Sequence, residues 1–144
     1  MREDRFVRYA PQILGILRIM TALLYMQHGL QKLFKFPDAG HHPEPFQILT
    51  LAGIAGILET FGGLSVLLGL FMRPVAFVLC GQMAVAYFLV HLGNNLGRPN
   101  GIFPVVNGGD LAILFCFVFL YLFIAGPGAF SIDGRLSAKK GEKS

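Results

Sequence analysis

The sequence predicts an all-α integral membrane protein: a bundle of four helices that cross a bilayer, with both termini in the cytoplasm. Of its 144 residues, 54% are hydrophobic and only 14% are charged, whereas a soluble domain carries about 25% charged residues. The apolar residues are gathered into four long runs. Lys and Arg flank these runs instead of forming a basic surface, so the net charge of +4 indicates membrane orientation and not a nucleic-acid partner.

Each run is long enough to cross a bilayer as a helix. A helix rises about 1.5 Å per residue, so a hydrocarbon core of about 30 Å needs roughly 20 residues. Prolines stand at three of the helix starts, where a missing N–H is tolerated: Pro11, Pro45 and Pro74. We expect spans at about 12–35, 47–71, 75–96 and 109–126, in one domain of residues 1–136 that is followed by a basic tail, 137–144.

The Lys and Arg residues that flank the apolar runs predict the orientation. One side carries eight of them, against three on the other side. The richer side holds both termini and a tight turn at Met72-Arg73, so we place it in the cytoplasm. The residues counted are Arg2, Arg5, Arg8, Arg73, Arg135, Lys139, Lys140 and Lys143 on that side, and Lys32, Lys35 and Arg98 on the other.

Polar residues recur at helical spacing and predict a polar interior. The first span has five of them on one face, at intervals of three and four residues, and each of the other spans has a set of four or five residues on one face that includes polar side chains. Charged groups in hydrocarbon are costly unless paired or hydrated, so these faces should point inward. The sets are Arg18, Thr21, Tyr25, His28 and Lys32; Ala52, Gly56, Glu59 and Gly63; Cys80, Ala84, Tyr87, His91 and Asn94; and Asp110, Leu114, Phe117 and Tyr121.

Depth along each span suggests which of these groups meet. His28 and His91 should lie at one level in the outer third of the membrane, and we expect Glu59 near its middle. We predict ion pairs of Arg18 with Glu59 and of Lys32 with Asp110. Together these polar residues should line one outward-facing cavity, walled by Tyr25, Tyr87 and Phe117.

Each candidate residue has a structural and a functional interpretation. Glu59 is either half of a register-fixing ion pair or a proton carrier. His28 and His91 have one structural interpretation, which is hydrogen bonding between helices. They have two functional ones: a proton relay or quinone contact, and paired axial ligation of a haem. Asn107 and Asp110 fit a capping box at the fourth span.

The remaining polar and sulfur residues are weaker candidates. Cys80 should lie near the cytoplasmic side and Cys116 in the outer half, so we do not expect them to pair; both read as small buried hydrophobes. His41 and His42 fall in an outer loop, where a solvated loop is favoured over a metal site.

Several motifs, taken in order, resemble the DoxX family of small membrane proteins. They are Leu17-Arg18, His28-Gly29-Leu30-Gln31-Lys32-Leu33, Glu59-Thr60-Phe61-Gly62-Gly63-Leu64, Leu68-Gly69-Leu70 with Arg73, Asn107-Gly108-Gly109-Asp110, Gly126-Pro127-Gly128 and Ser131-Ile132-Asp133. The family often has Glu at the position of Asp110. The resemblance implies a four-helix fold in the bacterial inner membrane and an association with redox chemistry, since relatives include the membrane subunit of a thiosulfate:quinone oxidoreductase.

Three functions remain open at this stage. The first is a membrane component of a redox system, a quinone-linked oxidoreductase subunit that binds a quinone or similar apolar cofactor. Glu59, His28 and His91 would then handle protons, and a redox partner protein would supply electrons. Arg18, Tyr25, Lys32, Tyr87, Asn94, Asn107, Asp110 and Phe117 would surround the ligand. The second is a small-solute or proton carrier, completed by homo-oligomerisation; the third is a structural subunit of a larger membrane complex.

Overall fold

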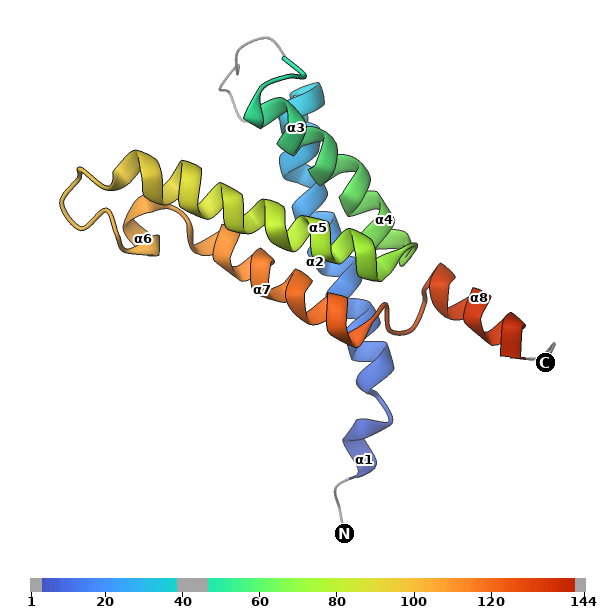
Figure 1. The fold of residues 1–144 in the computed structure, drawn as a ribbon. Coiled ribbons are helices and arrows are strands. Elements are labelled where there is room, and N and C mark those ends of the chain that lie inside the picture. Colours follow the sequence, from blue (N-terminus) through green and yellow to red (C-terminus); the bar gives the residue numbers. More distant parts are fainter. Residues whose placement is uncertain (1–3, 39–46, 142–144) are drawn as a thin grey trace.

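The computed structural model describes residues 4–38 and 47–141, and within these ranges every regular element is a helix. Pro45, His41 and His42 lie outside the described residues. Two π-helical turns, η1 and η2, and a short 3₁₀ turn, η3, extend the longer helices (Figure 1). The elements are α1 Asp4–Val7, α2 Ala10–Phe34, α3 Leu51–Ile57, η1 Leu58–Gly62, α4 Gly63–Leu68, α5 Met72–Val85, η2 Ala86–Leu92, η3 Gly93–Asn95, α6 Pro104–Asn107, α7 Asp110–Ala125 and α8 Ile132–Gly141.

Three continuous helical runs are long and apolar enough to cross a membrane: Ala10–Phe34, Leu51–Leu68 and Met72–Asn95. They correspond to the first three predicted spans. The fourth apolar helix, Asp110–Ala125, has 16 residues, or about 24 Å of rise. The all-helical fold is therefore as predicted, while the count of four spans stays a prediction.

Local chemistry explains where the second helical run begins and ends. Thr50 precedes α3, and its hydroxyl accepts a hydrogen bond from the Gly53 N–H at 3.0 Å, so the helix begins at Leu51 and not near residue 47. At the other end Gly69 has φ of 63°, a left-handed conformation that favours glycine. The turn predicted at Met72-Arg73 therefore lies slightly earlier, and both of those residues belong to the first turn of α5.

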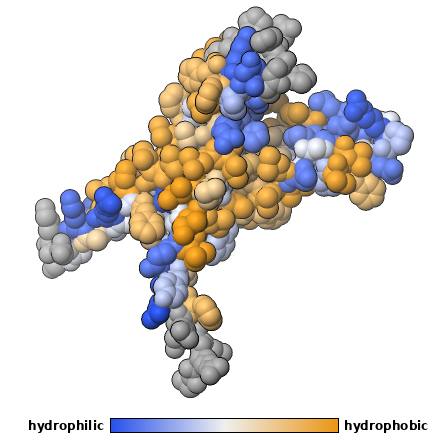
Figure 2. Space-filling view, turned by 180° about the vertical axis from the view of Figure 1, so that it is seen from behind, coloured by the Kyte–Doolittle hydropathy of each residue, from blue (hydrophilic) through white to orange (hydrophobic). Residues whose placement is uncertain are grey.

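The helices form two antiparallel hairpins that cross (Figure 1). In one, α2 packs along α3, η1 and α4; in the other, α5 packs along α7. The hairpins meet near the α4–α5 turn and diverge toward the loops that follow α2 and η3. Hydrophobic side chains cover the middle of the molecule, and hydrophilic ones gather toward the ends of its arms (Figure 2). This distribution suits a bilayer around the middle of the molecule.

The buried core lies where the hairpins cross. Tyr25 of α2 is at its centre, with its ring edge-on to Phe115 and Phe119 of α7 at centroid distances of 5.3 and 4.8 Å. Edge-to-face contact aligns the positive ring edge with the negative face of its neighbour. The core is completed by Ala22, Val66, Met72, Ala76, Leu79, Met83, Ala112 and Leu122. Because the core lies at the crossing, it closes one end of the space between the two diverging hairpins.

Candidate functional site

The charged centre of the fold is an ion pair between Lys32 of α2 and Glu59 of η1. The Lys32 ammonium lies 2.5 and 2.6 Å from the two Glu59 carboxylate oxygens. The Glu59 side chain is 4% exposed, and that of Lys32 is 38% exposed. The predicted pairing of Arg18 with Glu59 is therefore wrong: Lys32, 14 residues further along the same face of α2, supplies the cation.

Two neutral side chains extend this pair into the core. Gln82 of α5 donates from Nε2 to Glu59 Oε1 at 3.3 Å, and the Tyr25 hydroxyl donates to Gln82 Oε1 at 2.9 Å. The chain of contacts joins three helical elements that belong to both hairpins. A buried carboxylate with an ammonium and an amide donor is well compensated electrostatically.

Arg18 has a different role from the one predicted. It is fully buried, and its guanidinium donates to backbone carbonyls of Val66 and Leu67 at the end of α4 and of Pro127, Ala129 and Phe130 after α7. Carbonyls at a helix C-terminus lack intrahelical partners and carry partial negative charge, so a cation is stabilised there. Arg18 therefore ties the ends of α4 and α7 to α2, away from Glu59.

The pairing predicted for Lys32 and Asp110 is also wrong. Asp110 is exposed at the first position of α7, and its Oδ1 accepts a hydrogen bond from the Leu111 N–H at 3.0 Å. It is placed where an acidic group stabilises a helix N-terminus. Lys32 is engaged with Glu59 instead, because the flexible lysine stem carries its ammonium deeper than its Cα position.

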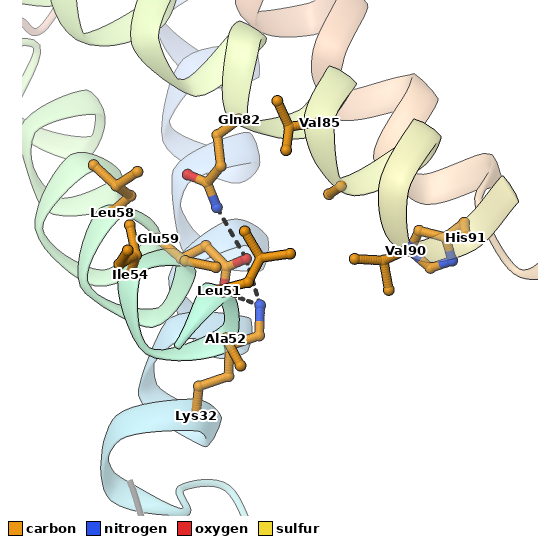
Figure 3. A pocket seen from close by; sticks show the side chains of 12 residues that line it. Lys32, Leu51, Ala52, Ile54, Leu58, Glu59, Gln82, Val85, Val90 and His91 are labelled. Atoms are coloured by element: carbon orange, nitrogen blue, oxygen red, sulfur yellow. Dashed lines mark hydrogen bonds and ion pairs between the residues drawn. The ribbon is translucent and has the colours of Figure 1, made fainter. Parts of the chain in front are cut away.

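A cleft of about 590 Å³ opens beside the ion pair, between the diverging hairpins. Eight of its 12 lining residues are apolar, and the polar ones are Lys32, Glu59, Gln82 and His91. Figure 3 shows Lys32, Glu59 and Gln82 joined on one side, with Val90 and His91 on the opposite side. An apolar space with a few convergent polar groups is the usual form of a small-molecule site, and its volume lies within the common range of about 300–1,000 Å³.

A second, smaller cavity of about 220 Å³ adjoins the same ion pair. His28, Tyr25 and Phe115 line it, and it shares Lys32, Glu59, Ala86 and His91 with the cleft. The structure thus brings His28, Glu59, His91, Lys32 and Tyr25 around one cavity, the grouping that helical spacing suggested. Because His91 borders both spaces, an imidazole lies between the ligand-sized cleft and the smaller cavity.

Both Glu59 and His91 lie in π-helical turns, η1 and η2. A π turn inserts one residue into the helical repeat and rotates the side chains that follow, and such turns are frequent at functional sites. The His91 ring is held in place by a contact of its Nδ1 with the Asn107 carbonyl oxygen at 3.2 Å. The distortion therefore coincides with the two ionisable residues that face each other across the cleft.

The helices that build this site coincide with a known sequence family. The sequence profile of the DoxX family matches residues 13–92, which include Lys32, Glu59, Gln82 and His91. The chain belongs to the DoxX family.

Full-length relatives of this DoxX-family protein are described mainly as membrane proteins. An uncharacterized protein of Haemophilus influenzae is 36% identical, over 92% of this chain and 96% of the relative. An uncharacterized membrane protein of Mycobacterium tuberculosis is 32% identical, over 90% and 83%, and the inner membrane protein YqjF of Escherichia coli is 28% identical, over 86% and 92%. No solved structure gives a significant match. Relatives and apolar helices together identify a bacterial membrane protein.

Six of the predicted site residues lie outside both cavities of this DoxX-family protein: Arg18 and Asp110, whose contacts are given above, and Tyr87, Asn94, Asn107 and Phe117. Phe117 is 64% exposed on α7, and Asn94 is exposed on η3. Tyr87 packs beside the backbone at Gly109, where an added Cβ would lie 2.6 Å from its ring. Asn107 is buried, donates to the Gly101 carbonyl and accepts from the Gly109 N–H at 2.8 Å, so it shapes the turn before α7 and is not half of a capping box with Asp110.

The sequence interpretation missed Gln82 and the apolar side of the cleft. Gln82 was detectable, because an amide within an apolar span needs a partner. The apolar lining was not, because its members resemble lipid-facing residues: Leu51, Ile54, Leu58, Val85 and Val90.

The two cysteines also lie differently from the prediction. Cys80 of α5 and Cys116 of α7 face each other, with their sulfur atoms 3.6 Å apart and both thiols free. They were expected at different depths. Their meeting shows the register in which α5 and α7 pack.

Within the described ranges no three His, Cys, Asp or Glu residues are grouped to hold a metal ion. His28 and His91 both border the cavity of about 220 Å³. The larger cleft combines an apolar space with an ammonium and an imidazole.

Proposed function

We propose that this DoxX-family protein is a membrane component of a redox system that binds a quinone in the cleft between its two hairpins. The observation that carries the proposal is the cleft itself: about 590 Å³ with mainly apolar lining, and Lys32, Glu59, Gln82 and His91 as its polar groups. A flat, lipid-soluble molecule with carbonyl oxygens matches this combination. Because the cleft lies between helices of a membrane protein, such a ligand reaches it from the bilayer.

Each polar residue has a distinct task in this proposal. Lys32 directs its ammonium into the cleft and donates to a carbonyl oxygen, while Glu59 holds the ammonium in position through two short contacts. Gln82, fixed by Tyr25, keeps the carboxylate oriented. A bound quinone would supply two-electron, two-proton chemistry, and electrons would come from a partner protein.

Proton handling falls to the two histidines. An imidazole exchanges protons near neutral pH, and His91 borders both the cleft and the smaller cavity that His28 lines. Protons can pass from His28 to His91 through that cavity and reach the ligand without crossing lipid. In the same proposal α7 is the fourth span, the smaller cavity faces outward, and both termini lie in the cytoplasm of the inner membrane.

The ultraviolet spectrum of gently solubilised protein, recorded before and after borohydride reduction, tests this function. We expect a difference band of a co-purified quinone. The band should be lost in Lys32→Met and Glu59→Gln variants that still purify as folded protein, and kept in Arg98→Gln, which removes a cation outside the cleft. A featureless difference spectrum of the unmodified protein, even after incubation with quinone and removal of the unbound quinone by gel filtration, would refute quinone binding and favour a carrier or structural role.

A further inference from the structure

A third cavity, of about 560 Å³, lies at the opposite end of α5 and shares no lining residue with the quinone cleft. The start of α5, the segment after α7 and the helix α8 enclose it. In Figure 1 α8 projects away from the crossed hairpins at this end. The proposed function does not use this cavity.

Cationic groups dominate the chemistry of this cavity. Arg73 and Lys140 line it from α5 and α8, together with the hydroxyl-bearing Ser137. Arg73 Nη1 donates to the Phe123 carbonyl oxygen at 3.2 Å, which anchors the guanidinium beside the end of α7 while leaving further N–H groups on the same fork. An anionic group bearing several oxygens is the natural complement.

The single acidic residue among those that line this cavity is already engaged. The Asp133 carboxylate accepts hydrogen bonds from the backbone N–H groups of Phe71 and Met72, at 3.1 and 2.8 Å, and so caps the start of α5. Its charge is offset by those amides and by the positive end of the helix dipole. Arg73 and Lys140 therefore leave the cavity with net positive charge.

The walls of the cavity are apolar, which distinguishes between possible anions. Phe71 and Leu136 are 66% and 52% exposed, and Pro74 and Pro127 lie beside them. Free phosphate would gain nothing from these surfaces, whereas an amphiphile would place its chains along them. Basic groups next to membrane-spanning helices attract anionic lipids, at about 1 kcal/mol for each Lys or Arg.

We propose that this cavity binds the headgroup of an anionic phospholipid, with Arg73 and Lys140 on the phosphate and the apolar side chains along the acyl chains. Bound lipid would bridge α5 and α8 and fix the position of α8 at the membrane surface. The proposal is independent of quinone binding.

Native mass spectrometry of the purified full chain tests this site, with phosphatidylglycerol and phosphatidylcholine as probes. The test variant carries Arg73→Gln and Lys140→Gln. The matched control carries Arg98→Gln and Lys139→Gln, which remove the same net charge at positions that do not line the cavity. Loss of two cations at about 1 kcal/mol each predicts roughly thirtyfold weaker retention of phosphatidylglycerol by the test variant and little change in the control.

Three outcomes would overturn the proposal. One is equal weakening in both double variants, which would show only general charge attraction. Another is equal retention of phosphatidylcholine and phosphatidylglycerol by the unmodified protein. The third is displacement of bound phosphatidylglycerol by inorganic phosphate alone, which would show a simple anion site. Melting temperatures of the variants show whether a loss of lipid reflects unfolding.

Discussion

Breaking the Lys32–Glu59 pair should destabilise the protein asymmetrically. Lys32→Met leaves the Glu59 carboxylate, 4% exposed, without its cation, and breaking a buried pair in this way costs about 3–5 kcal/mol. Glu59→Gln keeps an oxygen for Lys32, whose side chain is 38% exposed and can be hydrated. Because solvent screens the remaining ammonium, Glu59→Gln should lower the free energy of unfolding by only about 1–2 kcal/mol.

The double variant Lys32→Met/Glu59→Gln contains neither charge. The double variant should lose less unfolding free energy than the sum of the two single variants, by about 2 kcal/mol or more, because the effects of substitutions within one network are not additive. Unfolding by sodium dodecyl sulfate in mixed micelles, followed by circular dichroism, measures these free energies.

Arg18 supplies the control for this cycle. Its guanidinium donates hydrogen bonds to carbonyls of α4 and of residues 127–130. The effects of Arg18→Gln and Glu59→Gln on the free energy of unfolding should therefore be additive within about 0.5 kcal/mol. Additivity between Lys32 and Glu59, or strong coupling between Arg18 and Glu59, would refute the assignment of the pair.

Three further predictions follow from the packing and the charge distribution. Arg18→Lys should lower the unfolding free energy by about 2–4 kcal/mol in the same micelle assay, since one ammonium cannot reach acceptors on two segments; an unchanged value would show that the guanidinium fork is unnecessary. Gly69→Ala should be strongly destabilising, because φ is 63° and a Cβ would lie 2.5 Å from Ser131 Cβ, whereas Gly81→Ala, with nothing within 4 Å, should be neutral or stabilising; equal melting temperatures would contradict this. In a cysteine-free background, a membrane-impermeant thiol reagent on intact cells should label cysteine at Asn100 but not at Lys140, and the reverse pattern would invert the proposed orientation.

Hydrophobic runs and their punctuation were sufficient to predict the helices. The starts and ends differed by a few residues because single side chains decide them. Thr50 caps α3 three residues after Gln47, and Gly69 ends α4 in a left-handed conformation. Such local choices are visible in the sequence, but several neighbouring residues offer similar alternatives.

Helical spacing predicted which face each polar residue occupies but not which residues pair. Arg18, Glu59 and Lys32 all face inward, as expected. The carbonyls that bind Arg18 come from a helix end and a loop, and carbonyls leave no signature in a sequence. Lysine length also matters, since Lys32 reaches Glu59 from near the end of α2.

The cysteine error has a simpler origin. Cys80 lies eight residues after the start of α5 and Cys116 nine residues before the end of α7, or about 12 and 14 Å from the same side of the bundle. Measuring both from that side would have placed them together. The crossing of the two hairpins, in contrast, depends on side-chain packing, so the cleft could not be predicted from periodicity.

Quinone binding within the cleft can be tested most directly with a fluorescent reporter, because the chain has no tryptophan. Val85→Trp places an indole in the cleft lining, and Phe88→Trp places one at a position that is 61% exposed and outside the lining. In lipid nanodiscs titrated with a short-chain quinone, we expect saturable quenching at position 85, weakened by Lys32→Met, and only linear collisional quenching at position 88. Linear quenching at both positions would contradict a bound quinone.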